Sequence, residues 1–582
     1  GNEAEGVSSA ASDVYKRQVL AQRMAQVSNA QAETRELSAT ERAIAEVWKQ
    51  LLPGLADPAP LDESFFDLGG HSILATRLVF QLRHKLGVHV PLGLVFDAPT
   101  IAQLAAATEK ISSGGTDFLV AAPDTAKENA LSGDLDYAKD AQVLESELPA
   151  SFMRATPAGE PRVVLLTGAT GFLGAYVLAD LLDKRRNLVQ KVYVHVRAND
   201  AGSAQRRLRD ALAGRGLWRE AWEQEGRVQA VVGDLSKPHL GLNDADWAHL
   251  AKEVHVIVHN GALVHWVYPY SKLRAANVLS TMAVMRLANE GRPKSVAFVS
   301  STSALDTEYY IRFSDTSAQG VLESDSLDGS ASDLKSGYGQ SKWVAERLLM
   351  AAASRGLAAV IIRPGYVVGD SKTAVTNTDD FLFRLIKGSA QLGLIPDMNN
   401  TINMVPVDHV ARVTSLAGLA AIQWPENHQT HAAVFHVTSH PTIRYNEFLG
   451  ALIEYGWNVR PVEYLEWRTA LENHVLASAA AGNTGLDADS NALFPLLHFV
   501  LDDLPTSTKS PELNDANTTK LLTEAHELDV VRGVDVPLVG LYLSWLVAVG
   551  FLPPPASKSA RTLPALPEGA ARQAMGRGSA AV

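Results

Sequence analysis

V-V-L-L-T-G-A-T-G-F-L-G occupies residues 163–174, where an apolar run ends in a turn with three evenly spaced glycines. A helical run follows at once, so the turn joins a strand to a helix. Glycines at such a turn let backbone N–H groups and the helix N-terminus come close to a pyrophosphate. The spacing G-x-x-G-x-x-G in this context therefore predicts a dinucleotide site. Its predicted contact residues are Gly168, Thr170, Gly171, Phe172, Leu173 and Gly174.

Short β-branched runs alternate with helical stretches beyond this turn. After V-V-L-L-T come K-V-Y-V-H-V-R, V-Q-A-V-V-G-D, V-H-V-I-V-H-N, S-V-A-F-V-S-S, A-A-V-I-I-R-P and V-F-H-V-T. Because these runs are apolar without polar alternation, both faces of their sheet should be buried. The pattern predicts an α/β fold over residues 158–555, a doubly wound parallel sheet of Rossmann type. The less regular residues 371–555 predict a smaller, mainly helical C-terminal lobe.

The second strand indicates which dinucleotide is bound. It ends in Arg197, and Arg206 and Arg207 follow near the start of the next helix. An acid at this strand end suits the ribose hydroxyls of NAD, whereas an arginine accommodates the 2′-phosphate of NADP. The pattern favours NADPH. Asp200 lies in the same loop, and solvent-exposed arginines without a ligand are the alternative interpretation.

Further cofactor contacts are predicted where the later strands end. Asp234 ends the third strand and would reach the adenine edge, and Asn260 ends the fourth, where backbone would pass the cofactor. Each of these positions also has an ordinary loop interpretation. The predicted set is Asp234, Leu235, Asn260, Gly261, Ala262, Pro364 and Gly365.

Candidate catalytic residues follow in F-V-S-S-T-S and in Y-G-Q-S-K at 338–342. On a helix Tyr338 and Lys342 face the same way. A cationic lysine beside a phenol stabilises the phenolate and lowers a pKa that starts near ~10, which makes the phenol a usable proton donor. This order of motifs resembles the extended short-chain dehydrogenase/reductase family, whose triad is Ser/Thr, Tyr and Lys. Thr302 is the preferred hydroxyl member and Ser301 the alternative.

A separate helical unit is predicted over residues 36–109, and it contains F-D-L-G-G-H-S at 66–72. The unit resembles a four-helix acyl or peptidyl carrier domain, in which the serine of this motif receives 4′-phosphopantetheine. The matching residue is Ser72. Helix capping alone would explain Ser72, but it would not explain the flanking L-G-G-H or the later F-D-A-P-T-I-A-Q-L.

The remaining segments are predicted as connections. Residues 1–35 are expected to be a flexible leader, residues 110–157 a linker, and residues 556–582 a disordered tail. Within the linker, L-E-S-E-L-P is a candidate for docking on the following domain.

Length and composition limit the alternatives. The net charge of −12 argues against nucleic-acid binding, and the absence of cysteine excludes disulfides, thiolate metal sites and a cysteine nucleophile. His255 and His259 share a strand without clustered carboxylates, so no metal site is predicted. No apolar run approaches the roughly 18 residues of a membrane span, and no signal pattern is seen, so we expect a soluble cytoplasmic protein without membrane contact.

Several longer stretches carry a more specific resemblance. They are H-N-G-A-L-V-H-W-V-Y-P-Y-S-K-L-R-A-A-N-V (259–278), S-S-T-S-A-L-D-T-E-Y-Y (300–310), G-Y-G-Q-S-K-W (337–343), R-P-G-Y-V-V-G-D (363–370), T-N-T-D-D-F-L (376–382) and N-M-V-P-V-D-H-V-A-R (403–412). Over about 36–550, carrier included, the chain is similar to the fungal α-aminoadipate reductase family. That family also has an N-terminal adenylation domain, so the chain is expected to be a carrier–reductase fragment.

The resemblance implies NADPH-dependent reduction of an α-aminoadipyl thioester on the Ser72 arm to α-aminoadipate semialdehyde, a step of lysine biosynthesis. Thr302 and Tyr338 would hydrogen-bond the developing oxyanion, and Lys342 would hold the nicotinamide ribose and tune Tyr338. Implied partners are the chain's own acyl thioester, a phosphopantetheinyl transferase and an adenylation domain. Weak candidates for substrate contacts are Trp266, Tyr268, Tyr366 and Asn377.

Other functions stay open. A reductive-release domain of a nonribosomal peptide synthetase, or a carboxylic acid reductase, would use the same groups on another acyl thioester. A nucleotide-sugar epimerase or dehydratase would need neither Ser72 nor Arg197. A dinucleotide-sensing or scaffolding protein would need neither Tyr338 nor Lys342.

Overall fold

The computed structural model of the chain describes most of the sequence. The described residues are 37–52, 55–65, 68, 72–88, 90, 94–95, 98–113, 135–155, 161–265, 268–422, 432–480, 491–493, 500, 504, 508–557, 561–568 and 570. Among them, no helix is both long and apolar enough to cross a membrane.

A sheet of seven strands in the order β11-β6-β5-β4-β1-β2-β3 forms the centre of the larger domain, and every pair in it is parallel. Its strands are β1 (Arg162–Thr167), β2 (Val189–Val196), β3 (Val228–Val232), β4 (Val256–His259), β5 (Ser295–Val299), β6 (Ala359–Pro364) and β11 (Ala433–Val437). β4 and β5 are buried at every position, and β1 at all but its first, as expected for a sheet covered on both faces. The predicted doubly wound α/β fold is confirmed.

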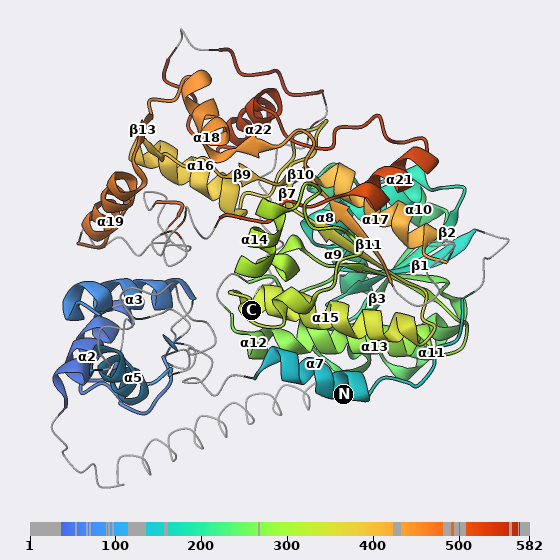
Figure 1. Cartoon of the computed structure of the whole chain (residues 1–582), viewed down its shortest axis with the longest axis horizontal. Helices are drawn as coiled ribbons and strands as arrows, with labels where there is room; N and C mark the ends of the chain where they lie inside the picture. The colour runs from blue at the N-terminus through green and yellow to red at the C-terminus, as the bar shows by residue number, and fades with distance from the viewer. Residues whose placement is uncertain are drawn as a thin grey trace, which may run out of the picture.

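Successive side chains of each strand enter two different cores. Val164 and Leu166 pack with α8 (Phe172–Ala179), α9 (Ala201–Ala213), α17 (Val407–Ala420) and α21 (Ala516–Glu524). Leu165 instead packs with α7 (Tyr137–Ser146), α11 (Asp244–Glu253), α13 (Ser280–Ala288) and α15 (Gly337–Ser354). This period of two follows from the pleat of a strand and explains why the runs lack polar residues. Figure 1 shows the two helical layers on either side of the sheet.

The C-terminal lobe has a third core of its own. Its main helices are α16 (Phe381–Leu392), α18 (Tyr445–Glu454), α19 (Tyr464–Ala480) and α22 (Val536–Ala548). Three two-stranded sheets accompany them, built from β7 (Tyr366–Val368), β8 (Leu394–Pro396), β9 (Thr401–Ile402), β10 (Met404–Pro406), β12 (Ile443–Arg444) and β13 (Arg460–Val462). The lobe lies over one end of the sheet, above it in the view of Figure 1.

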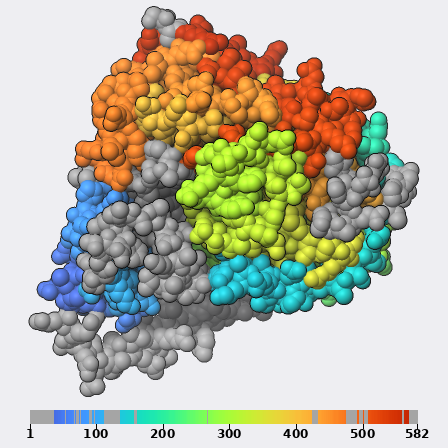
Figure 2. Space-filling view, in the orientation of Figure 1, coloured from blue at the N-terminus to red at the C-terminus, as the bar shows by residue number. Residues whose placement is uncertain are grey.

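Short helices complete the larger domain. They are η2 (Asp180–Lys184), α10 (Glu220–Gln224), η3 (Pro238–Gly241), α12 (Tyr270–Arg274), η4 (Ala275–Leu279), η5 (Thr302–Leu305), α14 (Glu308–Thr316) and η6 (Asp328–Ser330). Figure 2 shows the region that includes α14, coloured yellow-green, as a broad surface between the lobe and the N-terminal parts of the domain.

Two predicted connections differ from the structure. Leu144, Leu148 and Phe152 are buried in the core beside α15, so the L-E-S-E-L-P segment docks on the domain, as its candidacy suggested. The prediction that residues 137–146 belong to a linker is wrong, because α7 is part of this domain. Leu563 and Leu566 pack against the lobe's core. The prediction of a disordered tail is therefore wrong for residues 561–568, because those two apolar side chains find a surface that the local sequence does not reveal.

The carrier unit contains α2 (Ala39–Leu51), α3 (Ser72–Leu86) and α5 (Ile101–Ser113) around a separate apolar core. A capping box begins α2, since the Ser38 hydroxyl accepts from the Glu41 N–H and the Glu41 carboxylate accepts from the Ser38 N–H. Phe80 of α3 is buried in the lobe's core instead of the carrier's own. The helix that begins at Ser72 therefore contacts the C-terminal lobe, and Figure 1 shows the two side by side.

Candidate active site

The glycine turn after β1 is packed too tightly for any side chain. Gly168 has φ +76°, and a Cβ placed on it would lie 2.6 Å from the Cα of Gly261. A Cβ on Gly174 would lie 2.2 Å from the carbonyl oxygen of Gly168. Asn260 fixes the same carbonyl, to which its Nδ2 donates at 3.3 Å. Gly171 begins α8 without a side-chain cap, so the helix N-terminus offers its N–H groups to a ligand.

The end of β2 separates Arg197 from its acidic neighbour. The carboxylate of Asp200 accepts from the N–H of Ser203 at 2.8 Å and begins α9, and these bonds lower the pKa of Asp200. Asp200 is thus occupied as a helix cap. Arg197 is exposed, and Arg207 donates to the carbonyl oxygen of Arg197 at 2.8 Å. An exposed guanidinium with the nearby acid engaged elsewhere fits a 2′-phosphate.

Asp234 lies beside Arg197 at the end of the neighbouring strand β3. Burial works against its ionisation, but hydrogen bonds from Ser236 and the charge of Arg197 hold the pKa of Asp234 below its ordinary value. Its Oδ1 accepts from the N–H and the hydroxyl of Ser236. Leu235 borders the glycine turn, because a Cβ placed on Gly261 would lie 2.7 Å from the Cδ1 of Leu235.

The later strand ends complete this edge of the sheet. Gly261 N–H donates to the hydroxyl of Thr167 at 2.8 Å, which holds Gly261 and the adjoining Ala262 against the end of β1. Pro364 ends β6, and a Cβ on Gly365 would lie 2.4 Å from the carbonyl oxygen of Asn403. The predicted cofactor residues thus lie along one edge, because the carboxyl ends of parallel strands meet there.

The two candidate hydroxyls after β5 differ in their bonding. Ser301 is the N-cap of η5: its Oγ accepts from the N–H of Ser303 at 3.1 Å and donates to the Ser303 hydroxyl at 3.0 Å. Thr302 is half-buried, and no such bond engages its hydroxyl within the described residues. This difference leaves the Thr302 hydroxyl available for a bond to a ligand, and the choice of Thr302 over Ser301 stays a prediction.

Tyr338 and Lys342 lie on the same face of α15. The Lys342 Nζ is 5.7 Å from the centre of the Tyr338 ring and donates to the carbonyl oxygen of Val299 at 2.7 Å. Burial lowers the pKa of Lys342 to about 7, and the charge of Glu346 opposes that shift. A Cβ on Gly339 would lie 2.7 Å from the carbonyl oxygen of Ser303, so the glycine lets α15 approach η5.

Asn277 is a buried residue of this site that the sequence analysis missed. It lies in the π-helical turn η4, where its Oδ1 accepts from the N–H of Leu263 at 2.7 Å and its Nδ2 donates to the carbonyl oxygen of Leu263 and to the hydroxyl of Ser341. Asn277 therefore joins the segment after β4 to the helix of Tyr338. The R-A-A-N-V quoted for the family resemblance contained the signal, without a role attached to it.

Similarity to known proteins agrees with this geometry. Phosphopantetheine attachment sites match residues 42–108, and the NAD-binding family described as male sterility protein matches residues 166–414. The L-2-aminoadipate reductase of Schizosaccharomyces pombe is 46% identical over 530 residues, covering 89% of this chain and 36% of that protein. The crystal structure of the terminal R domain of the myxalamid PKS-NRPS pathway is 31% identical with a TM-score of 0.61, covering 72% of this chain and 100% of that domain. This chain belongs to the family of that reductase domain. Because it also contains a phosphopantetheine attachment site, we refer to it as a carrier–reductase.

A third relative shares the fold of this carrier–reductase in both of its parts. A thiolation–reductase di-domain from an archaeal nonribosomal peptide synthetase has a TM-score of 0.64 at 19% identity and covers 90% of this chain and 100% of its own. The chain spans about a third of the length of the S. pombe protein, 36%.

Behind the Tyr338 face, this carrier–reductase buries a pair of opposite charges that the sequence analysis also missed. Glu346 and Arg363 have no exposed side-chain surface, and Arg363 donates to both carboxylate oxygens at 2.6 to 3.1 Å. The Ser300 hydroxyl donates to Glu346, and Arg363 contacts His436 Nε2 at 3.1 Å. The pair ties α15 to the ends of β5, β6 and β11. The only signal for it was the spacing of four between Lys342 and Glu346.

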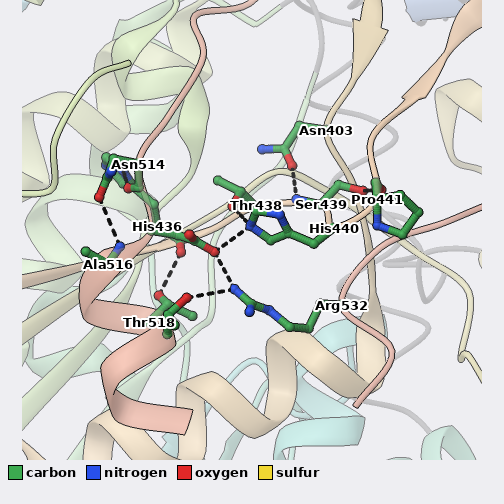
Figure 3. A network of polar contacts seen from close by, with 12 residues as sticks. Asn403, His436, Thr438, Ser439, His440, Pro441, Asn514, Ala516, Thr518 and Arg532 are labelled. Atoms are coloured by element: carbon green, nitrogen blue, oxygen red, sulfur yellow. Dashed lines mark hydrogen bonds and ion pairs between the residues drawn. The ribbon is translucent and has the colours of Figure 1, made fainter. Parts of the chain in front are cut away.

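The lobe is fixed to the same edge by a second polar network. Asp515 accepts from His440 at 2.8 Å and from Arg532 at 2.6 Å, and Asn403 accepts from the N–H of Ser439 at 2.7 Å. Figure 3 shows His440 and Arg532 converging while Asn403 points at Ser439. These bonds hold the loop after β11 beside the site.

The weak substrate candidates have unequal outcomes. Trp266 lies outside the described residues. Tyr268 is half-buried. It borders the start of α15, because a Cβ placed on Gly337 would lie 2.3 Å from the carbonyl oxygen of Tyr268. Tyr366 begins β7, next to the end of β6. Asn377 is buried, and its Oδ1 accepts from the N–H of residue 379, so it shapes the turn before α16.

Ser72 occupies the first position of α3, as its helix-start context predicted. Its side chain and the preceding residues 69–71 lie outside the described part of the structure.

Proposed function

We propose that this carrier–reductase uses NADPH to reduce an α-aminoadipyl thioester, held by phosphopantetheine on Ser72, to α-aminoadipate semialdehyde. The observation that carries the proposal is the Tyr338–Lys342 pair on the edge that also holds the glycine turn, in a chain that also contains a phosphopantetheine attachment site. The glycines of the turn leave no room for a Cβ against the neighbouring backbone, and the turn offers helix N–H groups, as a pyrophosphate requires. Identity to the S. pombe L-2-aminoadipate reductase supports the substrate.

The side chains divide the chemistry among them. Bound NADPH supplies hydride, and the pantetheine arm carries the thioester. Thr302 and Tyr338 donate hydrogen bonds to the thioester oxygen, on which negative charge develops, and Tyr338 gives that oxygen its proton. The carbon–sulfur bond would then break as the new hydroxyl loses its proton and the sulfur gains one, so that the free thiol leaves and the semialdehyde remains. Lys342 stabilises the resulting phenolate, and it is the protonated lysine that does so. Glu346 opposes the loss of that proton.

Residues 197 and 207 are proposed to select the phosphorylated cofactor. Arg197 offers an exposed guanidinium to the 2′-phosphate, with Arg207 bonded to its carbonyl oxygen. Asp234, Leu235, Asn260, Gly261, Ala262, Pro364 and Gly365 are proposed to line the rest of the cofactor path. A phosphopantetheinyl transferase and an adenylating partner are the proteins that the carrier unit would require.

The test is single-turnover reduction with Ser72 loaded chemically with aminoadipyl-pantetheine. Wild type should consume NADPH and yield the semialdehyde, Tyr338→Phe should lose most of the rate, and Ser72→Ala should not be loaded. Full turnover by Tyr338→Phe would remove the proposed proton donor.

A second candidate function is reductive release of another carrier-bound acyl group. The 31% identity to the myxalamid terminal R domain favours it. Equal rates for aminoadipyl and unrelated acyl groups on Ser72 would establish this broader function in place of the first.

A further inference from the structure

One acidic side chain near the predicted triad has no task in the chemistry above. Asp306 follows η5 directly as its C-cap, and Thr302 is the first residue of that short helix. With a rise of about 2.0 Å per residue, the Cα atoms of Thr302 and Asp306 are separated by roughly 8 Å. Asp306 therefore lies within one acyl chain's length of the group proposed to bind the thioester oxygen.

Asp306 is half-buried, and one of its two carboxylate oxygens lacks the partner that a buried acceptor normally has. Its Oδ1 is buried and makes no hydrogen bond to any residue that the structure describes. Burial raises the pKa of Asp306 to about 6, against the opposite effect of the charge of Lys335. Lys335 is exposed and forms no ion pair with Asp306. A buried acceptor left unsatisfied in a native fold needs an explanation, and a ligand is one of the few available.

Asp306 and Asp380 both lie near Tyr366. Burial raises the pKa of Tyr366, and the charges of these two acids add to that shift. Tyr366 follows β6, and β6 pairs with β5, which leads into η5, so the groups belong to neighbouring strand ends. Asp380 is occupied, because it caps α16 by accepting from the N–H of Leu382 at 2.9 Å. Of these two acids, Asp306 is the one with a buried oxygen left to receive a cation.

The proposed substrate carries one cation. In an α-aminoadipyl thioester four carbon–carbon bonds and one carbon–nitrogen bond separate the reacting carbonyl from the ammonium, which is roughly 6 Å when extended. This reach is of the same order as the separation of the Thr302 and Asp306 Cα atoms. This inference rests on the proposed function: we infer that Asp306 binds the distal ammonium group of the acyl chain and so selects acyl thioesters that carry an amine at that distance from the thioester carbonyl. The α-carboxylate of the same head group would then meet the opposite charge of Lys335.

The test measures binding, so that it does not depend on turnover. The full chain carrying Ser72→Ala, which has no arm of its own, is titrated by calorimetry in the presence of NADP⁺ with two pantetheine amides. Amides replace the thioester so that nothing is reduced. One amide carries the α-aminoadipyl group and the other the adipyl group, which differs only by lacking the amine.

We expect the aminoadipyl amide to bind about 10- to 100-fold more tightly than the adipyl amide, the range for a hydrogen bond between charged groups. Asp306→Asn should remove that difference and leave the adipyl affinity within about twofold. Asp328→Asn is the matched control, since Asp328 is an exposed acid paired with Arg347, and it should keep the preference. Equal affinities in the parent protein, or an equal loss for both amides in Asp306→Asn, would overturn the inference.

A separate arm keeps this inference apart from the proposed function. The parent chain with an intact, loaded Ser72 is assayed for NADPH consumption. A preference for the amine in binding without any reduction of the aminoadipyl thioester would refute the proposed function and leave the role of Asp306 standing. Reduction of the aminoadipyl thioester without a binding preference for the amine would support the proposed function and refute the role of Asp306.

Discussion

Replacement of Glu346 by glutamine tests how the helix of Tyr338 is held. The change keeps the shape of the side chain and removes the charge that faces Arg363. Both side chains are fully buried and joined by contacts of 2.6 to 3.1 Å, so the variant leaves a guanidinium uncompensated in the interior. Breaking a buried pair from one side costs about 3–5 kcal/mol. We expect a loss of that size in the free energy of unfolding of the reductase part.

The neighbouring surface pair gives the control. Arg347 follows Glu346 directly and contacts Asp328 at 3.0 Å, with Asp328 side-chain exposure of 74%. Asp328→Asn should cost at most about 1 kcal/mol, as exposed pairs do. Both variants are compared with wild type by urea denaturation. A loss below about 1 kcal/mol for Glu346→Gln would refute the assignment of this pair as a structural tie.

The same variant has a second readout. Because the charge of Glu346 opposes the loss of the Lys342 proton, Glu346→Gln should lower the pKa of Lys342 further below about 7. The protonated lysine is the form proposed to stabilise the phenolate, so the plateau of activity should end at a lower pH than in wild type. An unchanged pH profile alongside the expected loss of stability would limit Glu346 to packing α15.

Three further variants test the cofactor turn and the unpaired acid. Gly174→Ala should abolish NADPH binding in a fluorescence titration because its Cβ would lie 2.2 Å from a backbone oxygen, whereas Gly450→Ala, which meets nothing within 4 Å, should bind normally. Arg197→Asp should weaken NADPH at least about tenfold relative to NADH, measured as a ratio of dissociation constants, and equal weakening of both would contradict 2′-phosphate recognition. Asp306→Asn should gain stability over wild type as pH rises from about 4 to about 6, since a folded pKa of about 6 against 3.8 makes ionisation unfavourable by about 3 kcal/mol. Thermal unfolding of the variant and of wild type at pH 5 and pH 7 measures this gain. A stability difference between the two proteins that does not change with pH would contradict the prediction.

Local sequence patterns were sufficient to predict the parallel sheet and the glycine turn after its first strand. The apolar runs predict burial on both faces, and Val164 and Leu165 enter opposite cores, as their order requires. The glycine spacing predicts a close approach of backbone, and Gly168 meets Gly261 from the fourth strand. The capping-box spacing that starts at Ser38 predicted a helix start that the structure contains. Each of these predictions was made from residues close in sequence or from one strand period, although Gly261, which Gly168 meets, lies far along the chain.

Contacts between distant segments could not be predicted in the same way. Glu346 and His436 are 90 positions apart and meet only through Arg363, because β6 lies between β5 and β11. Leu563 and Leu566 stand in a proline-rich stretch, where nothing local indicates a surface to bury them. Such residues acquire partners from the strand order, which a single sequence does not specify.

The buried charges around Tyr338 fall into two kinds, and the distinction indicates which of them serves a ligand. The Glu346 carboxylate accepts hydrogen bonds from Arg363 and Ser300, so its burial is compensated inside the fold. Glu346 can therefore affect Tyr338 and Lys342 only by holding α15 in place and by its charge. Asp306 has a buried oxygen that the fold leaves unfilled, and its ionised form lowers stability near neutral pH. A fold keeps a group of that kind at a site where function outweighs stability. The acid that weakens the free protein is therefore the one expected to gain most when an ammonium arrives.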